Sequence, residues 1–126
     1  MLSSSPLLVH YDPSKELIPS CDSSSYSIGC ALLQTNGTGN LQPVAYASRT
    51  RSDTERRYVQ VEREALACVW GTLKMHQYAF GRHITIEADH KPLLGLLGET
   101  RAILPTPLSR VQRWALTLAG YDYSLV

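Results

Sequence analysis

Three acidic residues, far apart in the sequence, have the types and settings needed for a metal site. Asp22 and Asp89 each end a stretch with strand character, and Glu64 lies in a stretch with helical periodicity. Carboxylates that converge without a basic partner either retain a proton or bind hard cations such as Mg²⁺. Two such ions, about 3.5–4 Å apart, can activate water for phosphodiester cleavage. Ordinary solvated or salt-bridged carboxylates are the alternative for each acid.

Glu62 is a rival of Glu64 for the helical position in this cluster. At 100° per residue, the apolar arc of the predicted helix contains Glu62, with Glu64 at its margin. Because the two glutamates lie two residues apart, only one of them can point at the metals. Packing or a salt bridge is the simpler explanation for the other.

The size and composition of the chain favour one compact domain. Its 126 residues are 44% hydrophobic, which suits a single core. Residues 1–16, with Pro6 and Pro13, are predicted to form a linker, and residues 17–126 the domain. A formal charge of +1 excludes wholesale attraction to nucleic acid, so such binding requires a local patch or metal ions.

Neither a membrane span nor a disulfide framework is expected. The chain lacks an apolar run near 18 residues, and its first residues lack the features of a secretory signal. An intracellular protein is therefore expected. Cys21, Cys30 and Cys68 are odd in number and scattered among apolar residues, which favours buried thiols.

The first half of the chain predicts an antiparallel meander followed by a long helix. Strands are expected over residues 17–22, 27–35 and 41–48, with a hairpin turn at 36–40. Ser52 and Glu55 form a capping box, which predicts that one continuous helix starts there and runs to about Tyr78. Gly71 is its expected weak point.

The second half of the chain is predicted to add two more strands to the sheet, with helices between them. A strand is expected over 83–89, a short helix over 92–97, a helix over 108–120 and a last strand over 121–126. Strand–helix–strand connections place neighbouring strands parallel, so the first and fourth strands can be adjacent. Ligands in such sheets bind beyond the carboxyl ends of strands. Asp22 and Asp89 are therefore expected at one edge of an α/β sheet.

The chain resembles the ribonuclease H domain of reverse transcriptases from gypsy-type LTR retrotransposons, within the Pol polyprotein, from Val9 to Val126. The motifs that carry the resemblance keep a fixed order. They are Tyr11-Asp12-Pro13, Cys21-Asp22-Ser23-Ser24, Pro43-Val44-Ala45-Tyr46-Ala47-Ser48-Arg49, residues 58–67, His76-Gln77-Tyr78, Gly81-Arg82, Asp89-His90-Lys91-Pro92-Leu93, Arg113-Trp114-Ala115-Leu116 and Tyr121-Asp122-Tyr123.

This resemblance implies an RNase H-like fold with a mixed five-stranded sheet and flanking helices. It implies metal-dependent cutting of the RNA strand of RNA–DNA hybrids during reverse transcription, with two Mg²⁺ or Mn²⁺ ions. The implied partners are the hybrid and the polymerase domain of the parent polyprotein, without a membrane. The implied location is the cytoplasm, a virus-like particle or the nucleus.

By position in the motifs, the family's catalytic and metal-binding acids correspond to Asp22, Glu64 and Asp89 of this sequence. Glu64 precedes Ala-Leu-Ala as the family's helical glutamate does, which favours it over Glu62. Substrate contacts are predicted for His90 and Lys91, which follow Asp89, and exposed residues without a role are an equal alternative for these two. Nucleic-acid binding is also predicted for Arg110 and Arg113 on the late helix. Core packing is expected for Trp114.

The chain departs from the family pattern in three places. Ala88 stands where the family commonly has Thr, and Ser23 where it has Ala. The family's fourth metal-binding aspartate lies in a further helix, and the sequence ends at Val126, so a C-terminally truncated domain is expected. Three carboxylates offset two dications less completely than four, so a weaker second ion is expected.

Two other functions are compatible with parts of the pattern. A catalytically silent fragment, which binds nucleic acid or is a structural remnant, is distinguished by hybrid binding without metal-dependent cutting. Paired acids also serve glycoside hydrolysis, which needs a cleft lined with aromatic residues. An aromatic content of 8% and the family resemblance argue against that function.

Overall fold

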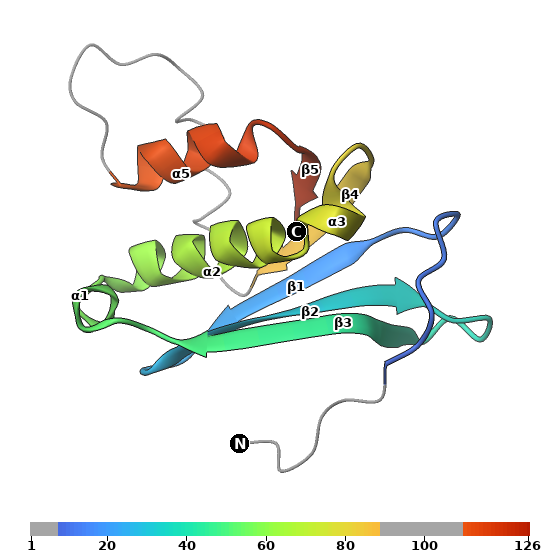
Figure 1. Cartoon of the computed structure of the whole chain (residues 1–126), viewed down its shortest axis with the longest axis horizontal. Helices are drawn as coiled ribbons and strands as arrows, with labels where there is room; N and C mark the ends of the chain where they lie inside the picture. Colours follow the sequence, from blue (N-terminus) through green and yellow to red (C-terminus); the bar gives the residue numbers. More distant parts are fainter. Residues whose placement is uncertain (1–7, 89–109) are drawn as a thin grey trace.

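The computed structural model describes residues 8–88 and 110–126 (Figure 1). Its β-strands form one five-stranded mixed sheet in the order β3-β2-β1-β4-β5. Helices flank this sheet, as the sequence predicts. The elements are β1 (Ile18–Ser23), β2 (Ser27–Thr35), β3 (Leu41–Thr50), α1 (Asp53–Arg56), α2 (Gln60–Lys74), α3 (His76–Ala79), β4 (His83–Ala88), α5 (Arg110–Leu118) and β5 (Asp122–Leu125).

The first three strands form the predicted antiparallel meander. β1 pairs with β2 and β2 pairs with β3, both antiparallel. The turn between β2 and β3 closes where the N–H of Asn36 donates to the carbonyl of Asn40 at 2.7 Å. Gly39 in this turn has φ = 88°, a conformation that glycine adopts without steric cost. The turn residues therefore set the register of the hairpin.

The remaining strands join the sheet in parallel. β4 pairs with β1, with Ser20 opposite Glu87 and Cys21 opposite Ala88. β5 pairs with β4, with His83 opposite Asp122. α2 lies in the connection between β3 and β4 and contacts β1, β2 and α5 (Figure 1). The predicted adjacency of the first and fourth strands is confirmed.

The prediction of one continuous helix from the capping box to about Tyr78 is wrong, because the chain forms α1, α2 and α3 there. The capping box exists, but it caps only the four-residue α1. α2 has its own start, where the N–H of Val59 donates to Glu62 Oε1 at 3.3 Å. A second cap within the periodic stretch divides the helix, and the periodicity alone does not show this division.

Glu55, the acid of the first cap, is also held by an arginine. Two Arg49 nitrogens donate to its two carboxylate oxygens at 2.7 and 2.9 Å. These hydrogen bonds lower the pKa of Glu55 to about 2. A depressed pKa contributes stability above the ordinary value of 4.5, and this contribution is lost as the pH falls towards 2. The pair therefore fixes α1 against β3 at neutral pH.

The core lies between α2 and the sheet. The three cysteines are free thiols buried in it, as predicted. The Cys21 and Cys30 sulfurs lie 3.8 Å apart on neighbouring strands. Hydrogen bonding to Cys30 and Cys68, together with burial, raises the pKa of the Cys21 thiol well above its usual range. The Cys21 thiol is therefore a protonated packing group at neutral pH.

Gly71 allows α2 to approach the sheet closely. A Cβ built at Gly71 would lie 2.7 Å from Cys30 Cβ and 3.1 Å from Cys21 Sγ. Gly71→Ala is therefore expected to lower the free energy of unfolding by about 1–2 kcal/mol, because overpacking outweighs the gain of about 1 kcal/mol in helix propensity. Urea denaturation measures this change.

Gly37→Ala is the matched control, because no atom lies within 4 Å of a Cβ built there. The control is expected to change the free energy of unfolding by less than about 0.5 kcal/mol. A Gly71→Ala protein as stable as the wild type would show that the two strands move away at little cost.

The residues before β1 contact the sheet and α3. The N–H of Val9 donates to the Pro43 carbonyl at 2.9 Å, and the Tyr11 and Tyr78 rings pack with centroids 5.3 Å apart. Arg82 donates to the Tyr11 hydroxyl at 3.0 Å. Part of the predicted linker is therefore tied to the domain. Within the described ranges, no helix has the length and apolarity that crossing a bilayer requires.

Candidate functional site

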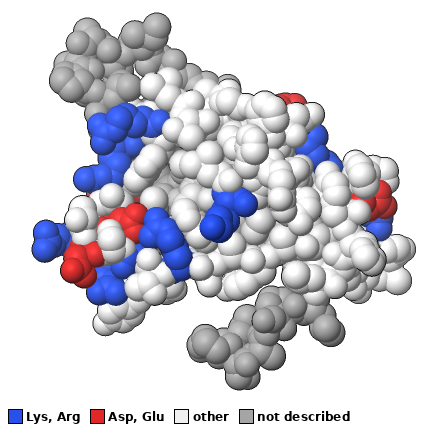
Figure 2. Space-filling model, in the orientation of Figure 1, with Lys and Arg blue, Asp and Glu red and all other residues white. Residues whose placement is uncertain are grey.

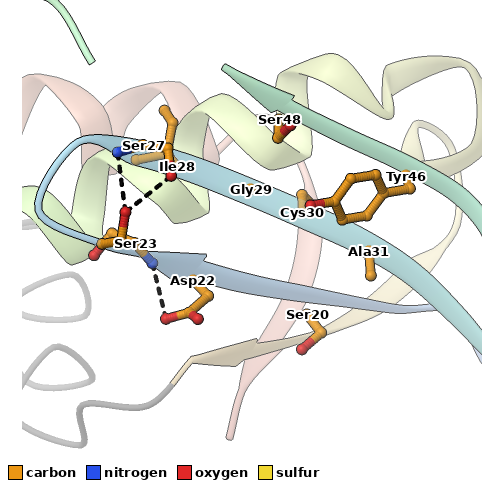
Figure 3. A pocket seen from close by; sticks show the side chains of 11 residues that line it. Ser20, Asp22, Ser23, Ser27, Ile28, Gly29, Cys30, Ala31, Tyr46 and Ser48 are labelled. Atoms are coloured by element: carbon orange, nitrogen blue, oxygen red, sulfur yellow. Dashed lines mark hydrogen bonds between the residues drawn. The ribbon is translucent and has the colours of Figure 1, made fainter. Parts of the chain in front are cut away.

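Asp22 lies near the carboxyl end of β1, on the face of the sheet turned away from α2. Cys21 faces α2, because its sulfur lies near the Gly71 position, and successive strand residues point to opposite faces. The Asp22 side chain is exposed, and its Oδ1 accepts a hydrogen bond from the N–H of Ser23 at 2.8 Å (Figure 3). This bond orients the carboxylate and leaves most of its acceptor capacity available.

A shallow hollow of about 290 Å³ lies beside Asp22 on this face (Figure 3). Gly29, which has no side chain, and Ala31, which has a small one, line part of the hollow and leave it open. Among the described residues that line it, Asp22 alone carries a charge. Hydroxyl groups supply most of its other polar atoms. They belong to Ser20, Ser23, Ser24, Ser27, Tyr46 and Ser48. The hollow therefore offers oxygen donors of the kind that hard cations prefer.

Glu64 lies in the second turn of α2 and is half-buried. Its Oε1 accepts a hydrogen bond from Gln60 Nε2 at 3.3 Å, one turn earlier on the helix. Because both residues belong to α2, this contact orients the carboxylate from its own helix. Glu64 does not line the hollow beside Asp22.

Glu62, the other glutamate considered for the metal site, has a structural role instead. Its Oε2 accepts from Arg110 Nη1 at 2.7 Å, while Oε1 caps the start of α2. Both oxygens therefore hold protein groups. The packing or salt-bridge interpretation of Glu62 is confirmed.

Asp89, His90 and Lys91 lie outside the described residues, so their predicted roles stay predictions. The chain is described up to Ala88, which precedes Asp89 and pairs with Cys21, the residue before Asp22. β1, which carries Asp22, and β4, which ends one residue before Asp89, are therefore parallel neighbours in matching register. Within residues 8–88 and 110–126, no three acidic, histidine or cysteine side chains form a group able to hold a metal.

The basic residues of α5 differ in setting. Arg110 contacts Glu62, and its guanidinium lies 4.2 Å from the centre of the Tyr58 ring. Arg113 is exposed. Trp114 is half-buried against the core, with its ring centre 5.8 Å from that of Tyr58, as expected for core packing. Substrate contacts by Arg110 and Arg113 stay predictions.

An arginine-rich end of the domain was not predicted. Residues 49–63 contain five arginines against three acids, and Figure 2 shows basic side chains gathered at the end that carries α1. Arg51 is only 2% exposed and donates to the carbonyls of Ser25 and Glu55. A count of charge over this short window finds the patch, whereas the overall charge of +1 hides it.

Comparison with known sequences gives a consistent result. Residues 12–121 match the family described as the RNase H-like domain found in reverse transcriptase. The chain is 33% identical, over 95% of its length, to the retrovirus-related Pol polyprotein from transposon 297 of Drosophila melanogaster. It is 34% identical, also over 95%, to that from transposon 412. It spans about a tenth of the length of these polyproteins.

Solved structures show the same fold. A foamy viral protease-reverse transcriptase in complex with RNA/DNA hybrid matches 94% of the chain, with a TM-score of 0.67 and 21% identity, over 16% of its own length. RNase H1 from Halobacterium salinarum matches 88% of the chain and 83% of its own length, with a TM-score of 0.57 and 18% identity. The sheet and helices described above are therefore arranged as in RNase H-like domains.

Proposed function

Because the chain belongs to the family of RNase H-like domains found in reverse transcriptase, we propose that it cleaves the RNA strand of RNA–DNA hybrids. It would do so as the ribonuclease H domain of a retrotransposon Pol polyprotein. The observation that carries the proposal is the family match over residues 12–121, joined to an exposed Asp22 on a strand in parallel register with β4. The reaction is endonucleolytic hydrolysis of a phosphodiester bond.

Divalent metal ions suit the donors that the chain presents. RNase H-like folds generally use them. Asp22 sits beside hydroxyl oxygens in an open hollow, and Glu64 is a half-buried carboxylate, so both supply hard oxygen ligands. We propose Asp22, Glu64 and Asp89 as the ligands of Mg²⁺ or Mn²⁺. Support for this shared site comes from the family match, because Glu64 does not line the hollow beside Asp22. When bound, such ions lower the pKa of an attacking water and stabilise the leaving oxygen.

The arginine-rich end suits the proposed substrate. Hybrids with A-like geometry are recognised largely by shape, phosphate contacts and the RNA 2′-hydroxyl. The four arginines over residues 49–63 other than the buried Arg51 supply a local patch that the overall charge does not. We further propose that the hybrid is delivered by the polymerase domain of the parent polyprotein, wherever in the cell reverse transcription takes place.

Incubation with a labelled RNA–DNA hybrid tests this function. The purified chain is expected to cut the RNA strand in Mg²⁺ or Mn²⁺ and to stop when EDTA removes the metal. The DNA strand and a matched RNA duplex should stay intact. An Asp89→Asn variant is the control for a contaminating nuclease. Hybrid binding without cleavage above that control would favour the catalytically silent fragment instead.

A further inference from the structure

Arg110 and Glu62 join two elements that are distant in sequence. Arg110 is the first residue of α5, and Glu62 lies in the first turn of α2. Their side chains meet at 2.7 Å, with exposed fractions of 36% and 24%. The pair is therefore partly shielded from solvent, where a charge-assisted hydrogen bond is stronger than at an open surface.

Aromatic contacts hold Arg110 in the same place. Its guanidinium lies over the Tyr58 ring at 4.2 Å, and Tyr58 packs against Trp114 of α5 at 5.8 Å. The stacking fixes the guanidinium plane while Glu62 fixes one of its nitrogens. Arg110 therefore has a defined position before any ligand arrives, and part of its charge is already neutralised.

Glu62 uses its second oxygen to start the helix that carries Glu64. Oε1 accepts from the N–H of Val59, the residue immediately before α2, at 3.3 Å. Glu64 follows two residues later in the same region of the helix. The position of its backbone therefore depends on how the first turn of α2 is held.

We propose that Glu62 and Arg110 form a positioning pair that sets the first turn of α2, and so the Glu64 carboxylate, for catalysis. This inference rests on the proposed nuclease function. It assigns Arg110 an indirect role, in place of the direct phosphate contact that its charge suggests. The two roles give different kinetics, because positioning acts on the reacting geometry whereas a phosphate contact acts on substrate binding.

The test compares Glu62→Gln, Arg110→Gln and the double variant in cleavage of a labelled hybrid. Each single change is expected to lower kcat about tenfold and to raise the Mg²⁺ concentration for half-activation, with KM for the hybrid nearly unchanged. Because the residues act through one contact, the double variant is expected to be no slower than the slower single variant. Arg110→Lys, which keeps the charge, should recover part of kcat.

A phosphate contact predicts another pattern. Arg110→Gln would then raise KM and reduce the slope of log binding constant against log salt by about one, while Glu62→Gln would leave kcat intact. That result overturns the inference. The matched control is Arg82→Gln, which removes an arginine that holds residues before β1 and is expected to lower the melting temperature without changing kcat.

Failure of this inference differs from failure of the proposed function. If the wild type does not cleave the hybrid, the nuclease function and the inference both fall. If the wild type cleaves and both single variants keep its kcat and metal dependence, the inference alone is wrong. Circular dichroism and thermal melting show whether each variant is folded at the assay temperature. If Arg110→Gln is unfolded at that temperature, Arg110→Lys takes its place in the comparison.

Discussion

Asp22→Asn is expected to lower the rate of hybrid cleavage by about 10³-fold or more. The change keeps the size and shape of the side chain but removes the negative charge that would hold a divalent ion. A loss of several kcal/mol of transition-state stabilisation corresponds to this factor, at about 1.4 kcal/mol for each tenfold. Steady-state cleavage of a labelled hybrid in Mg²⁺, and again in Mn²⁺, measures it.

The fold should survive this substitution. Asp22 is exposed, and its carboxylate accepts a hydrogen bond from the neighbouring N–H of Ser23, which an asparagine side-chain oxygen can accept as well. The melting temperature is therefore expected to stay the same or rise. Asp53→Asn is a suitable control, because its carboxylate is 90% exposed and pairs only loosely with Arg56 at 3.4 Å. Equal activity of Asp22→Asn and the wild type would remove Asp22 from the metal site.

Glu64→Gln is expected to have a loss of similar size, about 10³-fold in kcat, because glutamine is a weaker ligand for a hard cation. The expected loss at Glu62 is far smaller, about tenfold, since both Glu62 oxygens already hold Arg110 and the start of α2. Cleavage assays across a Mg²⁺ titration separate the two glutamates, because loss of a ligand also raises the metal requirement.

The reverse order of effects would contradict this assignment. If Glu62→Gln abolished cleavage and Glu64→Gln left it intact, Glu62 would be the metal ligand, and its contact with Arg110 would have to open during the reaction.

Gln60→Ala is expected to have an intermediate effect on cleavage. It removes the 3.3 Å contact that orients Glu64 from one turn away, so a modest loss of kcat is expected with the carboxylate still present.

The strands could be predicted from sequence because their signals are local. Alternation over 83–88 and the turn residues Asn36 and Gly39 depend on the backbone conformations that each residue type favours. The order of β1 and β4 could also be predicted, because strand–helix–strand connections have one common hand. These rules concern local sequence and the connections between elements, so they can be applied without knowing how the core packs.

The helical region was harder to predict for a different reason. The apolar spacing around Tyr58 continues across the junction between α1 and α2, so it shows no division. The division depends on Glu62 capping the second helix and on Glu55 holding Arg49 of β3. A capping box shows where a helix can start, but the contacts from distant elements decide how far that helix continues.

The sequence by itself determined the candidate acids, the buried thiols and the α/β order of elements, because residue type and short-range spacing govern all three. The tertiary structure decided which charged groups pair with one another. Glu62 and Glu64 differ little in local sequence, yet only Glu62 meets Arg110, from an element 48 residues away. A charged side chain takes the nearest partner that lowers its desolvation cost, and folding alone brings that partner near.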